Sequence, residues 1–309
     1  MKKISVVTPC YNEEENVEDV YNQVKAVFAK LDKYTYEHVF IDNCSRDKTV
    51  PILKNLAATD PNVKIIVNSR NFGPIRSHYH AMLQSKGDAV VLILADLQDP
   101  PVMIVDFIKK WEEGYKIVAA VKSGSDESPV FYAVRKAYYK LVNSVAEIEL
   151  INNFYGFGLY DQTVIQCLRD MNDPYPYLRG LIAEIGFDKA IIKYHQHKRT
   201  RGFSKNNLYT LYDVAMLGFT SHSKVPLRMA IFVGVTVGFF SLLSALVYFV
   251  YKLLYWDIFN VGTAPLVIGL FFFSAVQLFF IGVLGEYIGA IQTKVIKRPL
   301  VIEKERVNF

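Results

Sequence analysis

The chain has 309 residues, of which 51% are hydrophobic and 21% charged, and this composition excludes a disordered or low-complexity protein. Three cysteines without a CxxC pair exclude a disulfide scaffold and a cysteine zinc site. The net charge of +5 is too small to indicate nucleic-acid binding, which we do not expect. The mean hydropathy of +0.17 is high for a soluble protein, and the apolar residues are unevenly distributed.

The first part of the chain alternates short apolar runs with helical patterns. Apolar, β-branched runs predict strands at 4–8, 39–41, 63–67, 89–94 and 117–121. Between the first two, hydrophobic residues from Val17 to Leu31 repeat at helical spacing. Alternating strands and helices favour a mostly parallel sheet that is covered on both faces, so we expect one α/β domain over residues 1–205.

Polar residues follow four of these strands directly, at 9–12, 42–47, 68–73 and 96–99. In an open parallel sheet, ligands bind beyond the carboxyl ends of the strands. The four polar loops therefore predict a single ligand site. The chain contains neither GxGxxG nor GxxxxGK[ST], so neither the dinucleotide fingerprint nor the P-loop explains that site.

Several residues in these loops are candidates for ligand contacts. Asp96 follows a strand, as does a carboxylate that holds Mg²⁺ or Mn²⁺ beside a phosphate-bearing ligand. Asp99 precedes two prolines and is interpreted mainly as a helix cap. Asp42 either accepts hydrogen bonds from a base or ribose or simply forms a turn. Arg70 to Gly73 either recognises phosphate or is an ordinary loop.

A dense basic stretch at 198–205 precedes an amphipathic pattern at 206–224. Arg199 and Lys205 either clamp phosphates at a membrane surface or provide the positive charge that is usual on the cytoplasmic side of a membrane and attracts anionic lipid. The pattern at 206–224 predicts a juxtamembrane helix that lies in the membrane interface or packs against the domain. His195 and His197 would lie on one face of a strand and could be a pair of metal ligands. No third His or Cys lies nearby, so we favour a solvated strand over a metal site.

Two long stretches without charge follow, Met229–Tyr251 with 23 residues and Ile258–Gly285 with 28. At about 1.5 Å per residue, each is long enough to cross a hydrocarbon core of roughly 30 Å. We expect transmembrane helices at 225–255 and 263–291, followed by a cytoplasmic tail at 292–309. Basic flanks place the domain and both ends in the cytoplasm. Small residues in both spans permit association into a homo-oligomer.

The motifs, taken in order, resemble those of glycosyltransferase family 2. The four polar loops correspond to VVTPCYNEE at 6–14, DNCSRDKT at 42–49, RNFG at 70–73 and ADLQDPP at 95–101. RxxGxSK at 199–205, two apolar spans and GEYIG at 285–289 are similar to the polyisoprenyl-phosphate glycosyltransferases, such as bactoprenol glucosyltransferases and dolichol-phosphate mannose synthase. The resemblance covers nearly the whole chain.

The resemblance implies a GT-A fold, a nucleotide-sugar donor (UDP- or GDP-sugar) and Mg²⁺ or Mn²⁺. It also implies inverting transfer of a hexose to polyprenyl (undecaprenyl) phosphate at the cytoplasmic face of the cell membrane. Asp96 would hold the metal, and Arg199 and Lys205 would neutralise phosphates, so these three are the candidate catalytic residues. Carried over by position, the residues that would bind the nucleotide sugar are Pro9, Tyr11, Glu13, Asp42, Arg70, Asn71, Gly73, Asp96 and Gln98.

Three positions depart from the family pattern. Leu94 stands where the family usually has the first Asp of Asp-x-Asp, Asn43 replaces an acidic residue of the nucleotide motif, and Asn152-Asn153 occupies another acidic position. A lipid monophosphate is already an anion near pH 7, with a second pKa of about 6, and needs no general base. We expect Leu94 to weaken metal binding rather than abolish it.

Three alternative functions remain open. A non-catalytic nucleotide-sugar-binding scaffold is favoured by the loss of a carboxylate at Leu94. A processive polysaccharide synthase would need a QxxRW motif and a channel, but neither Trp111 nor Trp256 follows an Arg, and two spans cannot form a channel in one subunit. A lipid flippase would make no use of the four polar loops.

Overall fold

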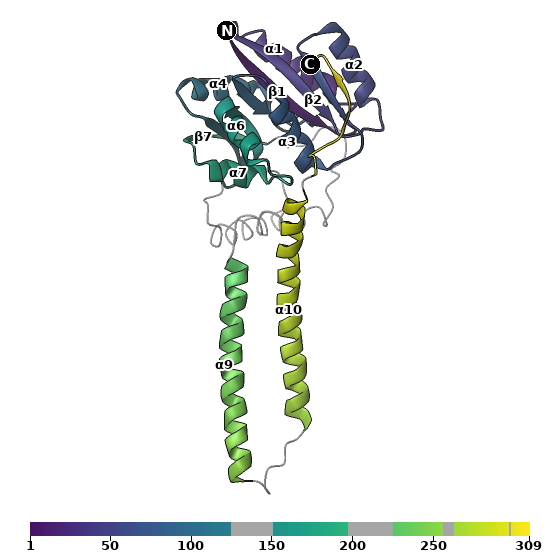
Figure 1. Cartoon of the computed structure of the whole chain (residues 1–309). Coiled ribbons are helices and arrows are strands. Elements are labelled where there is room, and N and C mark those ends of the chain that lie inside the picture. The colour runs from purple at the N-terminus through teal and green to yellow at the C-terminus, as the bar shows by residue number, and fades with distance from the viewer. Residues whose placement is uncertain (125–150, 197–224, 256–262, 297) are drawn as a thin grey trace.

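The structure is a computed structural model of the whole chain. It describes residues 1–124, 151–196, 225–255, 263–296 and 298–309. Figure 1 shows a domain of strands and helices from which the two longest helices extend as a pair. Both termini lie in the domain, so the chain leaves it for the helical pair and then returns.

One eight-stranded sheet forms the centre of the domain, in the order β7-β5-β6-β4-β1-β2-β3-β8. Strand β6 is antiparallel to both β4 and β5, and β8 is antiparallel to β3, while the other neighbours are parallel. Six strands therefore point the same way and end at one edge, called here the carboxyl edge. The strands are β1 (Lys2–Cys10), β2 (Tyr34–Asp42), β3 (Val63–Asn68), β4 (Ala89–Leu92), β5 (Ile117–Gly124), β6 (Phe154–Asp161), β7 (Lys189–His195) and β8 (Glu303–Val307).

Helices cover both faces of this sheet because alternate strand residues are apolar on opposite sides. On β2, Val39 and Ile41 pack toward α3 and α6, whereas Phe40 packs on the opposite face toward α1 and α2. The helices are α1 (Val17–Phe28), α2 (Thr49–Thr59), α3 (Pro74–Gln84), α4 (Ile104–Glu112, after a 3-10 turn η1 at Pro101–Met103), α6 (Gln162–Met171) and α7 (Leu178–Ile185). The predicted α/β class with a mostly parallel sheet is confirmed.

The expectation that residues 292–309 form a tail is corrected by the structure. Residues Glu303–Val307 form β8, which pairs antiparallel with β3, and Val301 just before it is buried. The first four residues of its sequence EKERV are all charged, so no hydrophobic pattern marks it as a strand. The boundary predicted at 205 and the helix predicted at 206–224 fall outside the described residues and stay predictions.

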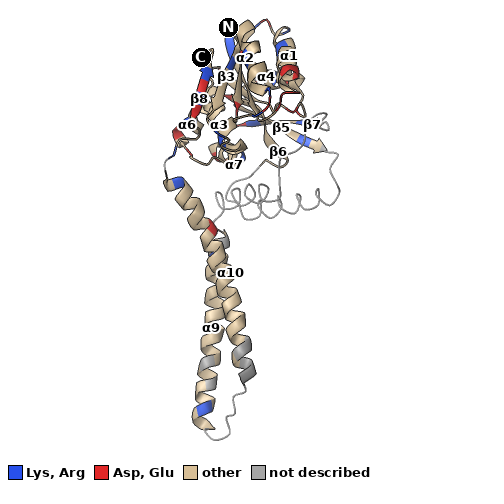
Figure 2. Cartoon of the chain, turned by 90° about the vertical axis from the view of Figure 1, so that its right-hand side faces the viewer, with Lys and Arg blue, Asp and Glu red and all other residues tan. Residues whose placement is uncertain are grey.

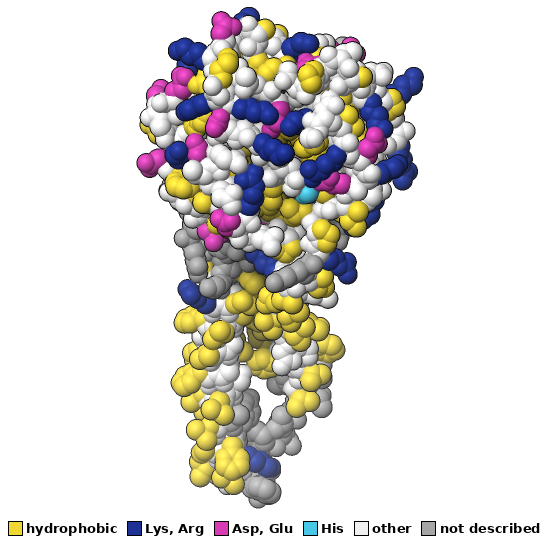
Figure 3. All heavy atoms as spheres, turned by 45° about the horizontal axis from the view of Figure 1, so that its top comes forward, with side chains coloured by type: hydrophobic (Ala, Val, Ile, Leu, Met, Phe, Trp, Pro, Cys, Tyr) yellow, Lys and Arg dark blue, Asp and Glu magenta, His cyan; other side chains and the backbone are white. Residues whose placement is uncertain are grey.

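The two long helices are α9 (Val225–Leu254) and α10 (Thr263–Val295), and they lie side by side (Figures 1 and 2). Leu227–Leu254 and Gly269–Val295 are long and apolar enough to cross a membrane, with mean hydropathies of 2.3 and 1.7. In neither helix is any part of the most apolar window buried inside the protein. Hydrophobic side chains dominate the surface of the pair, whereas charged and polar side chains are mixed over the domain (Figure 3). This contrast fits a polar domain attached to an apolar anchor.

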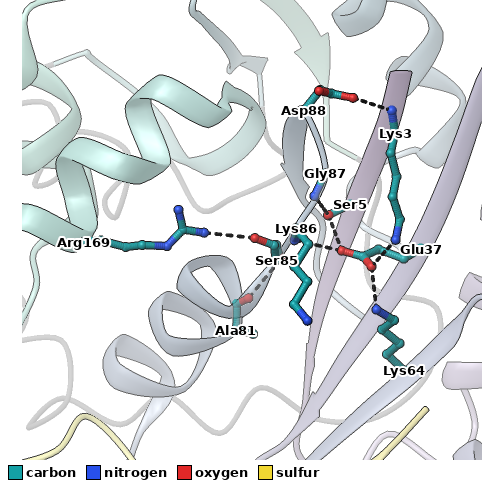
Figure 4. A network of polar contacts seen from close by, with 10 residues as sticks. All are labelled: Lys3, Ser5, Glu37, Lys64, Ala81, Ser85, Lys86, Gly87, Asp88 and Arg169. Carbon is teal, nitrogen blue, oxygen red and sulfur yellow. Dashed lines mark hydrogen bonds and ion pairs between the residues drawn. The ribbon is translucent and has the colours of Figure 1, made fainter. Parts of the chain in front are cut away.

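The opposite edge, where the parallel strands begin, is held by a buried polar network around Glu37 (Figure 4). Its carboxylate accepts hydrogen bonds from Lys3 Nζ at 2.7 Å, Lys64 Nζ at 2.8 Å, Ser5 Oγ at 2.5 Å and Lys86 N at 3.0 Å. Burial alone would raise the pKa of Glu37, but these donors lower it to about 2. The network links β1, β2, β3 and the turn before β4.

Candidate active site

The candidate site is built from the loops that follow β1, β2, β3 and β4 at the carboxyl edge. Three of these loops contain a non-glycine residue with left-handed backbone: Asn12 at φ 54°, Cys44 at φ 66° and Leu97 at φ 56°. Such backbone is costly outside glycine and persists where the surroundings over-determine it, typically at functional sites. The predicted convergence of the four loops is confirmed by the parallel pairing of their strands.

The loops after β1 and β2 are bonded to each other. The backbone N–H of Asn12 donates to Ser45 Oγ at 2.8 Å, and that of Glu13 donates to Thr49 Oγ1 at 2.8 Å. In return, Arg46 N donates to Asn12 Oδ1 at 2.7 Å. The half-buried residues of the first loop are therefore held in one conformation against the second.

Asp42 ends β2 and shapes the second loop. Its carboxylate accepts the backbone N–H of Ser45 at 2.9 Å and also the Ser45 hydroxyl. Burial raises the pKa of Asp42, while the bonds from Ser45 counteract that rise. The two bonds from Ser45 show that Asp42 shapes this turn, and Asp42 is 0% exposed. Its contact with a nucleotide stays a prediction.

Asn43 connects the second loop to the third through both atoms of its side-chain amide. Its Nδ2 donates to Asn71 Oδ1 at 2.9 Å, and its Oδ1 accepts Phe72 N at 2.9 Å and Asn68 Nδ2 at 3.2 Å. Asn71 Oδ1 in turn accepts Gly73 N at 2.8 Å. A carboxylate at position 43 could not donate to Asn71, which gives the departure from the family pattern a physical reason.

The third loop presents a cation next to a glycine turn. Arg70 is exposed, lies over the Phe72 ring at 4.0 Å, and donates to the carbonyl of Asn71 at 3.1 Å. Gly73 has φ 83° and nothing within 4 Å of an added Cβ, so its backbone rather than its surroundings favours glycine. Arg70, Asn71 and Gly73 thus lie in one loop at the carboxyl edge.

The segment after β4 carries the candidate metal ligand. Asp96 is half-buried and its Oδ1 accepts the backbone N–H of Gln98 at 3.3 Å. Leu94 is 37% exposed and Ala95 only 2%, so the position of the missing carboxylate faces outward as a leucine. Among the residues that the structure describes, no group of three or more His, Cys, Asp or Glu side chains could hold a metal ion.

Asp99 does not cap a helix as predicted. It is 3% exposed and its Oδ1 accepts the Tyr194 hydroxyl at 2.5 Å, while the following turn has no side-chain cap. Burial raises the pKa of Asp99 to about 6; the Tyr194 bond opposes this rise, Asp96 adds to it, and Lys122 opposes it. Asp99 therefore ties the loop after β4 to the end of β7.

Two cations at this edge were missed in the sequence. Lys122 on β5 places its Nζ 3.9 Å from the centroid of the Tyr155 ring, and Arg179 on α7 places its Cζ 4.6 Å from the same centroid. Lys122 directly follows the predicted strand at 117–121. The signal that marked the other loops, a polar residue directly after a strand, was therefore present at Lys122 as well. Arg179 lies on a helix with no such signal.

Most of the predicted site residues thus lie at the carboxyl edge, either at the end of a strand, as Pro9 and Asp42 do, or in the loop that follows one. These are Pro9, Tyr11, Glu13, Asp42, Arg70, Asn71, Gly73, Asp96 and Gln98. Arg199 and Lys205 lie outside the described residues, and their roles stay predictions. Asn153 has left-handed backbone at φ 55° and its carbonyl accepts Lys122 N at 3.3 Å, so the Asn152-Asn153 pair lies beside β5 at the same edge.

A mostly parallel α/β sheet with polar loops gathered at one edge is the architecture of a ligand-binding enzyme domain. The sequence profile of glycosyl transferase family 2 matches residues 5–169, and the chain belongs to this family. It is 34% identical over 302 residues to the uncharacterized glycosyltransferase YkcC of Bacillus subtilis, covering 96% of this chain and 92% of that protein. The predicted family and enzyme class are confirmed: the protein is a glycosyltransferase.

Another relative carries a more specific name. The SfII prophage-derived bactoprenol glucosyl transferase of Shigella flexneri is 33% identical over 304 residues, which is 98% of each chain. Among solved structures, the mannosyltransferase PcManGT from Pyrobaculum calidifontis in complex with GDP-Man and Mn²⁺ has a TM-score of 0.48 at 18% identity, covering 71% of this chain and 62% of that one.

Proposed function

We propose that the protein is a membrane-bound, inverting glycosyltransferase that moves a hexose from a UDP- or GDP-sugar to polyprenyl phosphate at the cytoplasmic face of the cell membrane. One observation carries the proposal. The carboxyl edge with Asp96 is also the edge at which α10 rejoins the domain, through the pairing of Asn68 with Glu303 and an ion pair of 3.4 Å between Lys294 and Asp173. The relatives named bactoprenol glucosyl transferases support the lipid acceptor.

In the proposed reaction, an oxygen of the acceptor phosphate attacks the anomeric carbon of the donor sugar. The bond from that carbon to the leaving diphosphate breaks on the opposite side, so the configuration inverts. The products are a polyprenyl phosphohexose and a nucleoside diphosphate. Because the acceptor is already an anion, no general base has to remove a proton. This makes an Asn152-Asn153 pair sufficient where an alcohol acceptor would demand a carboxylate.

The donor would bind across the loops of the carboxyl edge. Pro9, Tyr11 and Glu13 would contact the nucleoside together with Asp42, since their loop is fixed against the loop after β2. Arg70, Asn71 and Gly73 would face the diphosphate with Gln98. The rigid bonding of these loops supports the assignment because a preformed site loses less entropy on binding.

A divalent cation fits the residues present. Asp96 is a half-buried carboxylate in the loop that follows β4, and Mg²⁺ and Mn²⁺ are commonly held by one or two carboxylates together with phosphate oxygens and water. When bound, the ion would neutralise charge on the leaving diphosphate. The outward-facing Leu94 removes one ligand, so the affinity depends on the donor phosphates.

The remaining need of the reaction is charge neutralisation, because both reactants carry phosphate. Lys122 and Arg179 bring two positive charges to the Tyr155 ring at the carboxyl edge. The charge of Lys122 also lowers the pKa of Asp99. Arg199 and Lys205 would add further cations from the juxtamembrane segment. Such preorganised charges stabilise a transition state without reorganisation.

The test is transfer of labelled hexose from a panel of nucleotide sugars to undecaprenyl phosphate by the purified full-length protein. Asp96→Asn is expected to reduce turnover by at least about 100-fold, as removal of a metal ligand or key electrostatic group does. Asp106→Asn is the matched control, since Asp106 is an exposed residue of α4. Unchanged turnover in Asp96→Asn would remove Asp96 from the mechanism.

The outward-facing Leu94 specifically favours the second candidate, a non-catalytic nucleotide-sugar-binding scaffold. Calorimetry with UDP-sugars and GDP-sugars, run beside the transfer assay with Mn²⁺ and polyprenyl phosphate, separates the two. A scaffold binds the donor but forms no lipid-linked product. Product formation that depends on Asp96 excludes it.

A further inference from the structure

The last part of the chain returns from α10 and is built into the domain. Beyond Val295, Leu300 packs against the core on the α3 side and Val301 is 5% exposed. The backbone N–H of Ser69, in the loop after β3, donates to the carbonyl of Ile302 at 2.9 Å. Strand β8 then runs antiparallel to β3. The segment 298–309 is called the strap below.

Side chains hold the strap to the domain from Glu303 to Asn308. Glu303 Oε1 lies 2.6 Å from His80 Nε2, and Glu305 lies 2.7 Å from Lys54 Nζ. At the end of the strap, Asn308 Nδ2 donates to the carbonyl of Ala57 at 2.8 Å and to that of Val63 at 2.9 Å. Exposed pairs contribute little individually, but a paired strand with buried flanking residues resists release as a unit.

The strap fixes how far the site can lie from the end of α10. Residues 296–300 can span at most about 18 Å, at 3.3–3.6 Å per residue, before Leu300 enters the core. The next contact is with Ser69, which belongs to the same loop as Arg70 and Gly73. The covalent path from α10 to the candidate donor loop is therefore short and ends in a hydrogen bond to that loop.

A lipid-linked acceptor makes this distance chemically important. Every buried CH₂ of a lipid chain stabilises its insertion into the bilayer, so a long polyprenyl chain keeps its phosphate at the level of the headgroups. The site must therefore come to the phosphate. A flexible insert of ten residues has an r.m.s. end-to-end distance of roughly 16–19 Å, which is similar to the longest distance that residues 296–300 can span.

We infer that the strap is a positioning element, which sets the height of the carboxyl edge above the membrane so that the donor sugar meets a membrane-bound phosphate. This inference rests on the proposed function and deepens it. It predicts different behaviour for two acceptors that carry the same phosphate group. A polyprenyl phosphate in a vesicle needs the strap, whereas a short-chain, water-soluble prenyl phosphate diffuses to the site and does not.

The experiment inserts ten Gly and Ser residues between Arg298 and Pro299, both exposed, in the full-length protein. The strand pairing of β8 and the connection at 197–224 remain intact. The same insertion after Gly114, in the exposed turn between α4 and β5, is the matched control. The measurements are the donor KM and kcat/KM for undecaprenyl phosphate in vesicles and for the soluble prenyl phosphate.

For the insertion at 298, kcat/KM with the vesicle acceptor is expected to fall about 10-fold or more, while donor KM and transfer to the soluble acceptor stay within about 2-fold. The Gly114 insertion is expected to change none of them. Undiminished transfer in vesicles would overturn the inference, and so would an equal loss with both acceptors. If the unaltered protein transfers sugar to neither acceptor, the proposed function fails and the inference fails with it.

Discussion

The two edges of the same sheet are built on opposite principles. At the edge where the parallel strands begin, the buried carboxylate of Glu37 receives four hydrogen bonds, and its pKa falls to about 2 (Figure 4). At the carboxyl edge, the carboxylate of Asp99 receives the Tyr194 hydroxyl, but its burial outweighs this bond and raises its pKa to about 6. One carboxylate stabilises the fold, whereas the other is kept at a cost to stability.

The comparison shows how one topology separates stability from function. Parallel strands bring all their starts to one edge and all their ends to the other. The first edge can therefore be made rigid without touching a ligand. The second is left with strained loops and poorly solvated charges, which are the features that a stability–activity trade-off predicts for a working site.

The largest expected effect is at the first edge. Glu37→Gln leaves Lys3 and Lys64 facing a neutral amide, and breaking a buried charge pair on one side costs about 3–5 kcal/mol. Hydrogen exchange of the β1 and β2 amides measures the loss. Glu113→Gln, in an exposed pair with Lys110, is the control and should leave hydrogen exchange of these amides unchanged. Equal effects in the two variants would break the comparison.

A second effect of several kcal/mol is expected from pH. His38 is 0% exposed, and burial lowers its pKa from 6.5 to about 3. Between these two values the unfolded chain binds a proton that the folded chain does not, so stability falls as pH decreases from about 6.5 toward 3. The slope for one group is about 1.4 kcal/mol per pH unit.

His38→Gln should reduce that slope, because the glutamine amide can still bond Thr8 Oγ1, which lies 2.9 Å from His38 Nε2, but does not titrate in this range. The measurement is the free energy of opening of the β2 amides, by hydrogen exchange, at several pH values between 4 and 7. A slope that is the same in the variant would remove His38 as its source.

At the carboxyl edge the sign reverses. The folded pKa of Asp99 lies near 6 and its ordinary value near 3.8, so its contribution to stability decreases as pH rises through that window. Asp99→Asn still accepts the Tyr194 hydroxyl but carries no buried charge. We expect this variant to be more stable than the parent protein at pH 7.5, by about 1–3 kcal/mol. A destabilised variant would show that the charge of Asp99 supports the fold.

A smaller effect, on binding, is expected for Asn43→Asp. The carboxylate loses the bond to Asn71 Oδ1 and repels it, so the loop from Arg70 to Gly73 loses its support. Donor KM should rise about 10-fold, with kcat changed less, because a positioning bond and not a reacting group is lost. Asn55→Asp on the exposed face of α2 is the control. A donor KM equal to that of the parent protein would show that the amide is dispensable.

The sequence predicts the strands that are apolar and β-branched, because burial on both faces leaves that pattern. It does not predict β6, in which Gly158 is required because a Cβ would lie 2.2 Å from the Val118 carbonyl oxygen. Nor does it predict β8, whose charged residues pair with His80 and Lys54 from distant parts of the chain. Contacts of that range leave no local periodicity.

The site divides in the same way. Parallel topology alone gathers the polar loops, so their convergence can be predicted from where the strands end. What each side chain does there cannot. From the sequence, Asn43 is interpreted as a lost carboxylate, but in the structure its side-chain amide both donates and accepts hydrogen bonds. Asp99 is interpreted as a helix cap, but in the structure it accepts the Tyr194 hydroxyl. Both roles depend on partners that the chain supplies from another loop or strand.

The smallest expected effect distinguishes the strap from the second link between α10 and the domain. Asp173 Oδ2 lies 3.4 Å from Lys294 Nζ, and Asp173 Oδ1 accepts Tyr175 N at 2.9 Å. Asp173→Asn keeps the second bond and loses only the charge. Because Lys294 is 47% exposed, the pair contributes about 0–1 kcal/mol, so transfer to a vesicle acceptor should fall by no more than about 5-fold. Lys294→Gln should match it, and the double variant should add nothing. A fall above about 10-fold would mean that this ion pair, and not β8, holds the carboxyl edge at its height.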